Sequence, residues 1–123
     1  MTLSRERFEE LVADALESLP AFLRQKLENV AVLVEDQPSS EIQKQFPDQL
    51  LMGLYQGVPQ PERSVWNLPT QPDVIHIYKH NIESLCATEK EIREQVRITV
   101  IHEIGHYFGL DEDALERLES GEP

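Results

Sequence analysis

A long helix with clear boundaries near the C-terminus constrains this sequence more than any other feature. Thr88 is followed three residues later by Glu91, a capping box in which each side chain accepts from the other residue's backbone N–H. We expect the helix to run to about residue 108, because Gly109 suits the left-handed conformation that ends a helix. Its apolar residues are Ile92, Val96, Val100, Ile101, Ile104 and Phe108. A helix with so many apolar positions must be covered by other elements of the chain.

The rest of the sequence predicts one further long helix and several short strands. Apolar residues recur every three or four positions over residues 4–19, which indicates an amphipathic helix. The continuous apolar run at residues 30–34 predicts a strand buried on both faces, or nearly so. Residues 50–55 predict a second strand, in which Gly53 marks close-packed backbone. The alternating pattern of residues 74–79 predicts a half-exposed strand at a sheet edge.

The remaining segments are predicted to connect these elements. Residues 36–48 hold two prolines and alternating charge, so we expect a loop that can carry one helical turn. Four prolines lie between Gly57 and Asp73, which predicts irregular structure with a short strand at residues 64–68. A last short helix is expected at residues 112–118.

Length and charge limit the classes of partner. The 123 residues predict one domain, residues 1–123. Eleven Lys and Arg against 23 Asp and Glu give a formal net charge of −12, so nucleic acid and anionic membranes are unfavourable partners. A single cysteine, Cys86, excludes an internal disulfide and a zinc site with several cysteines. The sequence shows no signal peptide and no membrane span, so we expect a cytoplasmic protein.

The predicted C-terminal helix contains an H-E-x-x-H motif, formed by His102, Glu103 and His106. Residues four apart on a helix project side by side, so the two imidazoles can bind one Zn²⁺ ion. Glu103 flanks the pair and can act as the general base that takes a proton from a zinc-bound water, whose pKa falls to about 7. The alternative is a pair of surface histidines on an amphipathic helix. Buried without a partner, these side chains would be costly in so apolar a stretch.

A third zinc ligand is expected shortly after the motif. Gly109, three residues past the second histidine, lets the chain turn sharply, and the position ten past the first histidine then supplies a ligand. That position is Glu112, whose carboxylate zinc accepts. Asp111 and Asp113 flank it and remain alternatives, although Asp111 suits the N-cap of the last helix and Asp113 its first turn.

The sequence resembles the small zinc-dependent metallopeptidases with a minimal, zincin-like domain. The segments that carry the resemblance are TVIHEIGHYFGLDEDALERL, LLMGLYQGVPQPERS, DVIHIYKHNIESLC and SRERFEELVADALESLP. The resemblance implies an α+β fold, in which a small mixed sheet packs against an N-terminal helix and a long active-site helix. It also implies zinc on His102 and His106, with Glu103 as base. Members usually have aspartate where this chain has Glu112.

Four further side chains are candidates for the site. His76 alternates with apolar neighbours and is interpreted as a structural residue, whereas His80 could polarise a substrate carbonyl. Tyr78 and Tyr107 could stabilise an oxyanion, although aromatic packing is their commoner role.

Two functions compete on this basis. The first is a zinc-dependent peptidase that binds an extended peptide or protein substrate along the strand at residues 74–79. The second is a non-catalytic zinc-binding module with a regulatory or binding role, because so short a chain leaves few residues for specificity pockets. An acidic interaction protein without metal is a more distant alternative.

Overall fold

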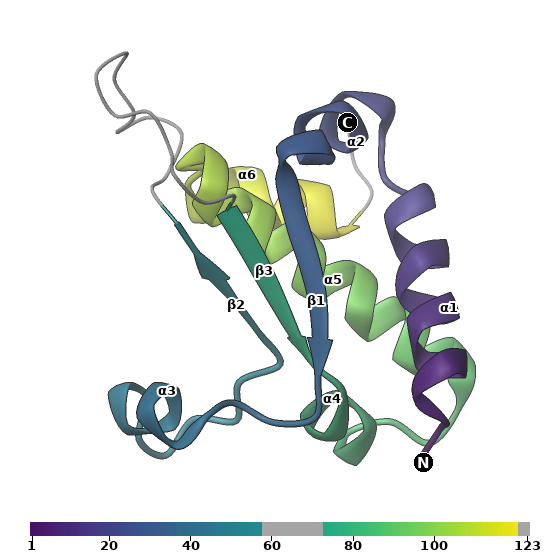
Figure 1. The fold of residues 1–123 in the computed structure, drawn as a ribbon. Helices are drawn as coiled ribbons and strands as arrows, with labels where there is room; N and C mark the ends of the chain where they lie inside the picture. Colours follow the sequence, from purple (N-terminus) through teal and green to yellow (C-terminus); the bar gives the residue numbers. More distant parts are fainter. Residues whose placement is uncertain (58–72, 121–123) are drawn as a thin grey trace.

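Residues 1–57 and 73–120, which the computed structural model describes, form a three-stranded sheet and a set of helices (Figure 1). The predicted short strand at residues 64–68 lies outside these ranges. No helix within them is long and apolar enough to cross a membrane. The elements in chain order are α1 (Arg5–Glu17), α2 (Ala21–Lys26), η1 (Leu27–Asn29), β1 (Val30–Glu35), α3 (Ser40–Gln45), β2 (Gly53–Gln56), β3 (Asp73–Tyr78), α4 (Lys79–Ser84), α5 (Glu89–Phe108) and α6 (Glu112–Ser120).

The sheet has the strand order β1-β3-β2. β1 runs parallel to β3 with Leu33 opposite His76, and β2 runs antiparallel to β3 with Leu54 opposite the same residue. The predicted edge position of residues 74–79 is therefore wrong, since β3 is the central strand and Lys79 already belongs to α4. Alternation shows that one face of a strand is less covered than the other, which is equally true of a central strand in a sheet covered on one side.

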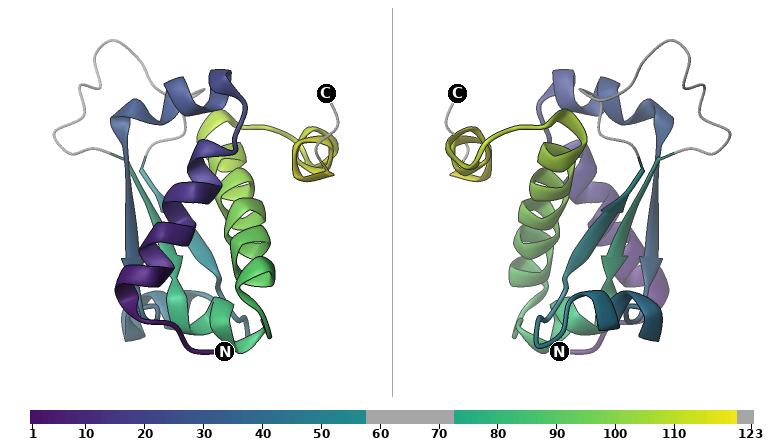
Figure 2. Two further views of the ribbon diagram at one scale, coloured as in Figure 1. Left: turned by 90° about the vertical axis from the view of Figure 1, so that its right-hand side faces the viewer. Right: turned by 90° about the vertical axis from the view of Figure 1, so that its left-hand side faces the viewer.

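β1 also differs from its prediction. Its residues are half-buried or exposed, and the Leu33 side chain is 47% exposed, so the strand is not buried on both faces. The long helices α1 and α5 lie on the same side of the sheet (Figure 2). An apolar run alone does not distinguish a strand covered on both faces from an edge strand covered on one.

The hydrophobic core lies between the sheet and these two helices. Each fully buried aliphatic side chain in it contributes roughly 1.5–3 kcal/mol relative to an exposed one. The predicted α+β class, with a small mixed sheet against an N-terminal helix and a long C-terminal one, is confirmed. The principal core residues are Phe8, Leu11, Val12 and Ala15 of α1, Ile75 and Ile77 of β3, and Ile92, Val96, Val100, Ile101 and Ile104 of α5.

α5 begins and ends where the sequence predicted. The Thr88 hydroxyl accepts from the Glu91 N–H at 3.1 Å, and the Glu91 carboxylate accepts from the Thr88 N–H at 3.3 Å. Gly109 ends the helix in the left-handed conformation, with φ 66° and ψ 31°. The H-E-x-x-H motif therefore lies in the last turns of a helix that is fixed at both ends.

Two glycines allow neighbouring elements to approach α5 closely. A β-carbon at Gly53 would lie 2.6 Å from Thr99 Cγ2 and 2.9 Å from the His76 carbonyl oxygen, so β2 packs directly against the helix. A β-carbon at Gly105 would lie 1.9 Å from Leu115 Cδ2, so α6 fills the space beside the motif. These contacts set the positions of β2 and α6 relative to the motif.

We predict that Gly53→Ala lowers the free energy of unfolding by about 1–3 kcal/mol, because the added methyl overlaps Thr99 and the β3 backbone. The measurement is urea denaturation followed by circular dichroism. Adding Thr99→Ser removes the methyl that the new β-carbon meets and should restore part of the loss. Equal stability of Gly53→Ala and the wild type would show that β2 is not held this closely.

Candidate metal centre

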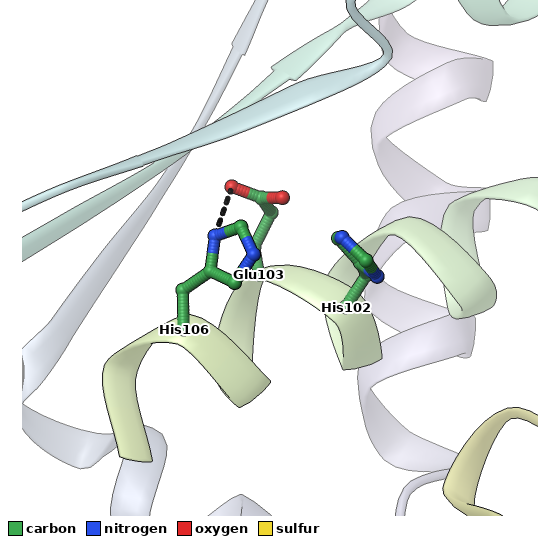
Figure 3. Close-up of side chains that lie close together, drawn as sticks. All are labelled: His102, Glu103 and His106. Atoms are coloured by element: carbon green, nitrogen blue, oxygen red, sulfur yellow. Dashed lines mark ion pairs between the residues drawn. The ribbon is translucent and has the colours of Figure 1, made fainter. Parts of the chain in front are cut away.

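His102, Glu103 and His106 come together on α5, as the sequence predicted. Each offers one ligand atom, and the three atoms lie within 4.8 Å of one another. The two imidazole centroids are 4.9 Å apart, and Figure 3 shows the Glu103 carboxylate beside the His106 ring. His106 is exposed and His102 half-buried, whereas Glu103 is only 6% exposed.

Glu103 is held by the neighbouring strand. The Tyr55 N–H donates to Glu103 Oε1 at 2.5 Å, and His106 Nδ1 lies 3.9 Å from the same oxygen. The pairing of β2 with β3 explains the direction of this N–H. The Met52 carbonyl accepts from the Tyr78 N–H, and in an antiparallel ladder successive residues point their backbone groups alternately toward and away from the partner strand. Tyr55, three residues after Met52, therefore points its N–H away from β3 and toward α5. Among the described residues, Glu103 Oε2 makes no hydrogen bond or ion pair.

The donor set fits a zinc ion. Imidazole nitrogens are ligands that zinc prefers. Two donors about 2.1 Å from one ion lie roughly 3.4 Å apart in a tetrahedral site, so the imidazole nitrogens, which lie within 4.8 Å of each other, would approach by at most about 1.4 Å to share an ion. The exposed His106 ring has room for that shift.

The three acids after the motif occupy different positions. Asp111 caps α6, since its carboxylate accepts from the Ala114 N–H at 2.8 Å. Glu112 is the first residue of α6 and is exposed, and Asp113 follows it. Among the described residues, neither belongs to the group of possible ligands around His102. The assignment of Glu112 as third ligand therefore stays a prediction.

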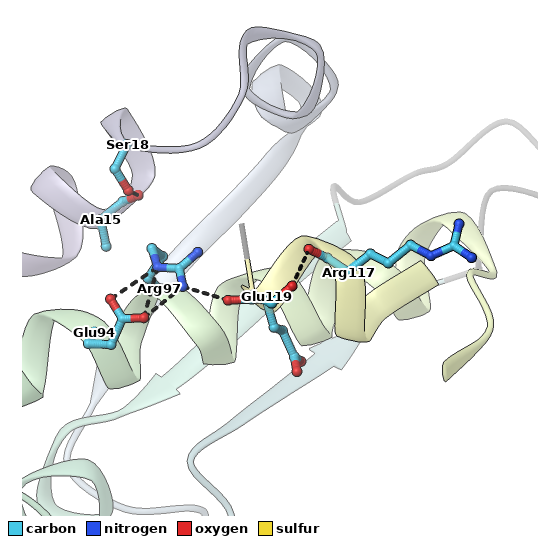
Figure 4. Close-up of polar contacts among 7 residues, drawn as sticks. Ala15, Ser18, Glu94, Arg97, Arg117 and Glu119 are labelled. Carbon is cyan, nitrogen blue, oxygen red and sulfur yellow. Dashed lines mark hydrogen bonds and ion pairs between the residues drawn. The ribbon is translucent and has the colours of Figure 1, made fainter. Parts of the chain in front are cut away.

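A fourth carboxylate, Glu119, reaches the site without having been predicted. Its Oε1 lies 3.3 Å from His102 Nδ1. The sequence signal is its spacing, because Glu112, Leu115 and Glu119 share one face of α6. Leu115 turns that face toward α5 by packing against Gly105. The end of α6 is fixed by Arg97, which donates to the Glu119 carbonyl at 2.7 Å (Figure 4).

A cavity of about 380 Å³ opens beside the histidines. His102, Glu103, His106 and Glu119 contribute its acidic and imidazole groups. No Lys or Arg is among the described residues that line it. Its apolar wall is formed by Phe46, Leu50, Leu51, Met52, Leu54 and Ile98.

The other candidate residues lie outside this cavity. His76 is a structural residue, as predicted, with Nε2 2.7 Å from Gln56 Oε1 and Nδ1 paired with Glu35. His80 is exposed on α4. Burial first, and then the carboxylates of Glu35 and Glu103, raise the pKa of Tyr78 to about 12. Tyr107 is buried and packs edge-on against Tyr55.

Comparison with known proteins gives the family. The model of the zincin-like metallopeptidases matches residues 27–122. The chain belongs to this family. A solved structure, described as a conserved hypothetical protein from Thermo thermophilus, is similar over 85% of this chain and 92% of that one. Its TM-score is 0.55 and its sequence identity 22%, so this likeness concerns the fold alone. No curated protein matches the sequence.

The family confirms the resemblance inferred from the motif and gives the site its context. Zincin-like proteins typically bind zinc, and the His102, Glu103 and His106 group is a possible zinc site on this fold. The fold is of the metallopeptidase type.

We predict one zinc per wild-type chain and its loss from His102→Ala and His106→Ala, because each change removes one of two imidazole donors. Elemental analysis after gel filtration measures the content. His80→Ala is the matched control, because this exposed histidine lies on α4 and outside the group. Near-full zinc occupancy in either motif variant would refute the site.

The third ligand can be tested by comparing neighbouring acids. Substitution of a residue that only contacts a zinc ligand typically weakens zinc affinity roughly 10–100-fold. Glu112→Ala should weaken it by more than this, because it removes a ligand. Asp111→Ala should instead lower stability by about 1 kcal/mol, because it removes the α6 cap, with little change in zinc affinity. Competition with a chromophoric chelator measures the first effect and thermal unfolding the second. The reverse ranking of zinc affinities would move the ligand to Asp111.

Proposed function

We propose that this protein is a zinc-dependent hydrolase of peptide bonds. The observation that carries the proposal is the placement of Glu103, a buried carboxylate that the Tyr55 N–H fixes beside two histidines with zinc-ligand spacing. Its second oxygen makes no hydrogen bond or ion pair among the described residues, and the side chain lines the cavity. The family is consistent with this chemistry.

His102 and His106 would hold the ion, which supplies Lewis acidity and lowers the pKa of water to about 7. Glu103 acts as the general base. Its Oε1 is engaged by the Tyr55 N–H, so Oε2 is the atom that accepts the proton of the attacking water. Because the backbone bond fixes the carboxylate, little ordering is required when substrate binds.

The cavity supports a substrate with a large uncharged side chain. Its apolar wall offers burial to such a group, and its only charged side chains among the described residues are the acids Glu103 and Glu119. An acidic substrate side chain would be repelled there. A pocket of this size weakens the argument for a purely non-catalytic module, which rested on lack of room.

An extended peptide would bind along β2. β3 cannot accept it, because β1 and β2 occupy both its edges. On the outward edge of β2 the Tyr55 N–H already donates to Glu103, so a peptide would pair with the backbone around Gly53, which lines the same cavity as the histidines.

The proposal is tested with zinc-loaded protein and an unbiased peptide library, with products identified by mass spectrometry. We predict cleavage next to large apolar residues. Glu103→Gln should keep zinc but lose cleavage by roughly 10²-fold or more, because it removes the base. Glu116→Gln, which makes the same change at an exposed position of α6, is the control.

Two outcomes would contradict the proposal. Undiminished cleavage by Glu103→Gln would remove the general base from the mechanism. A wild-type protein that holds zinc but cleaves no library peptide would favour the non-catalytic zinc-binding module.

A further inference from the structure

We propose that Glu119 is a positioning residue of the metal centre, which orients His102 by accepting a hydrogen bond from its Nδ1. The inference rests on the zinc site of the proposed function. It concerns a residue outside the H-E-x-x-H motif, on a different helix and 17 positions away in sequence.

The contact determines which nitrogen of His102 is available to a metal. Glu119 Oε1 lies 3.3 Å from Nδ1, and an ionised carboxylate can only accept a hydrogen bond. Nδ1 therefore carries the proton of the neutral imidazole, and Nε2 presents its lone pair. A carboxylate in this position fixes the ring orientation and makes the ligating nitrogen more basic.

Glu119 is held in place by its surroundings. Its backbone carbonyl accepts from Arg97 Nη2 at 2.7 Å, and Arg97 is itself paired with Glu94, through Nη2 at 2.6 Å (Figure 4). One turn earlier, Leu115 packs into the space left by Gly105. The Glu119 side chain is 27% exposed, so it is partly shielded from water where it meets His102.

The same geometry separates Glu119 from the ligands. It contacts Nδ1 of His102, and it does not belong to the group of possible ligands formed by His102, Glu103 and His106 among the described residues. Glu112, on the same face of α6 two turns earlier, is the predicted ligand from this helix. α6 would thus supply one ligand and one positioning group.

The experiment measures zinc affinity by chelator competition at fixed pH for the wild type, Glu119→Ala, Glu119→Gln and Glu116→Ala. We expect Glu119→Ala to weaken binding about 10–100-fold. Glu119→Gln keeps a hydrogen-bond acceptor of the same shape, so it should retain more affinity than alanine. Glu116→Ala, an exposed acid on the same helix, should match the wild type. Circular dichroism of the metal-free proteins checks that each variant is folded.

The visible absorption spectrum of the Co²⁺-substituted proteins supplies a second measurement. A positioning role predicts that Glu119→Ala keeps the band shape and intensity of the wild type once saturated, since no ligand is lost. An altered spectrum, with glutamine no better than alanine, would make Glu119 a ligand and overturn the inference. Unchanged zinc affinity in Glu119→Ala would overturn it as well.

Failure of this inference is distinguishable from failure of the proposed function. Normal zinc binding by both the wild type and Glu119→Ala removes only the role of Glu119. A wild type that binds zinc but cleaves no peptide removes only the hydrolase. A wild type that binds no zinc overturns both.

Discussion

A carboxylate removed from water needs a hydrogen-bond donor nearby, and Glu103 finds one in the backbone of β2. That N–H reaches the helix because Gly53 lets the strand lie against Thr99. The strand in turn keeps its register through pairing with the central β3. The orientation of the candidate base therefore depends on packing that extends from the middle of the sheet to the last turns of α5.

Local sequence signals predicted the features that depend on neighbouring residues. The Thr88 capping box, the Gly109 terminus and the Asp111 cap each involve bonds within a few positions, and all are found. The order of the strands was not predicted, because a hydrophobic pattern reports how well a face is covered and not which strand lies alongside. α4 was missed because its N-cap residue, Tyr78, makes no side-chain bond to the helix. Glu119 was missed because its contact with His102 depends on how α6 packs.

The cavity shows how a short chain can form a pocket without a second domain. Its apolar wall combines one side chain at the end of α3, several from the segment leading into β2, and Ile98 of α5. Most of these side chains are half-buried where the segment folds back against the helix, whereas Leu50 is 51% exposed. The same polypeptide that joins β1 to β2 thus provides the surface on which a substrate side chain would be buried, next to the residues expected to perform the chemistry.

Gly105 occupies one of the two positions that the H-E-x-x-H pattern leaves undefined. In this fold the position is not free, since Leu115 fills the space where a side chain would be. A sequence search or a protein design that allows any residue at position 105 would accept chains with an intact motif. In such chains a side chain at this position would leave no room for Leu115, and so for α6. In this chain the motif, the glycine at this position and the leucine ten residues later together describe a packed site as well as a pair of histidines.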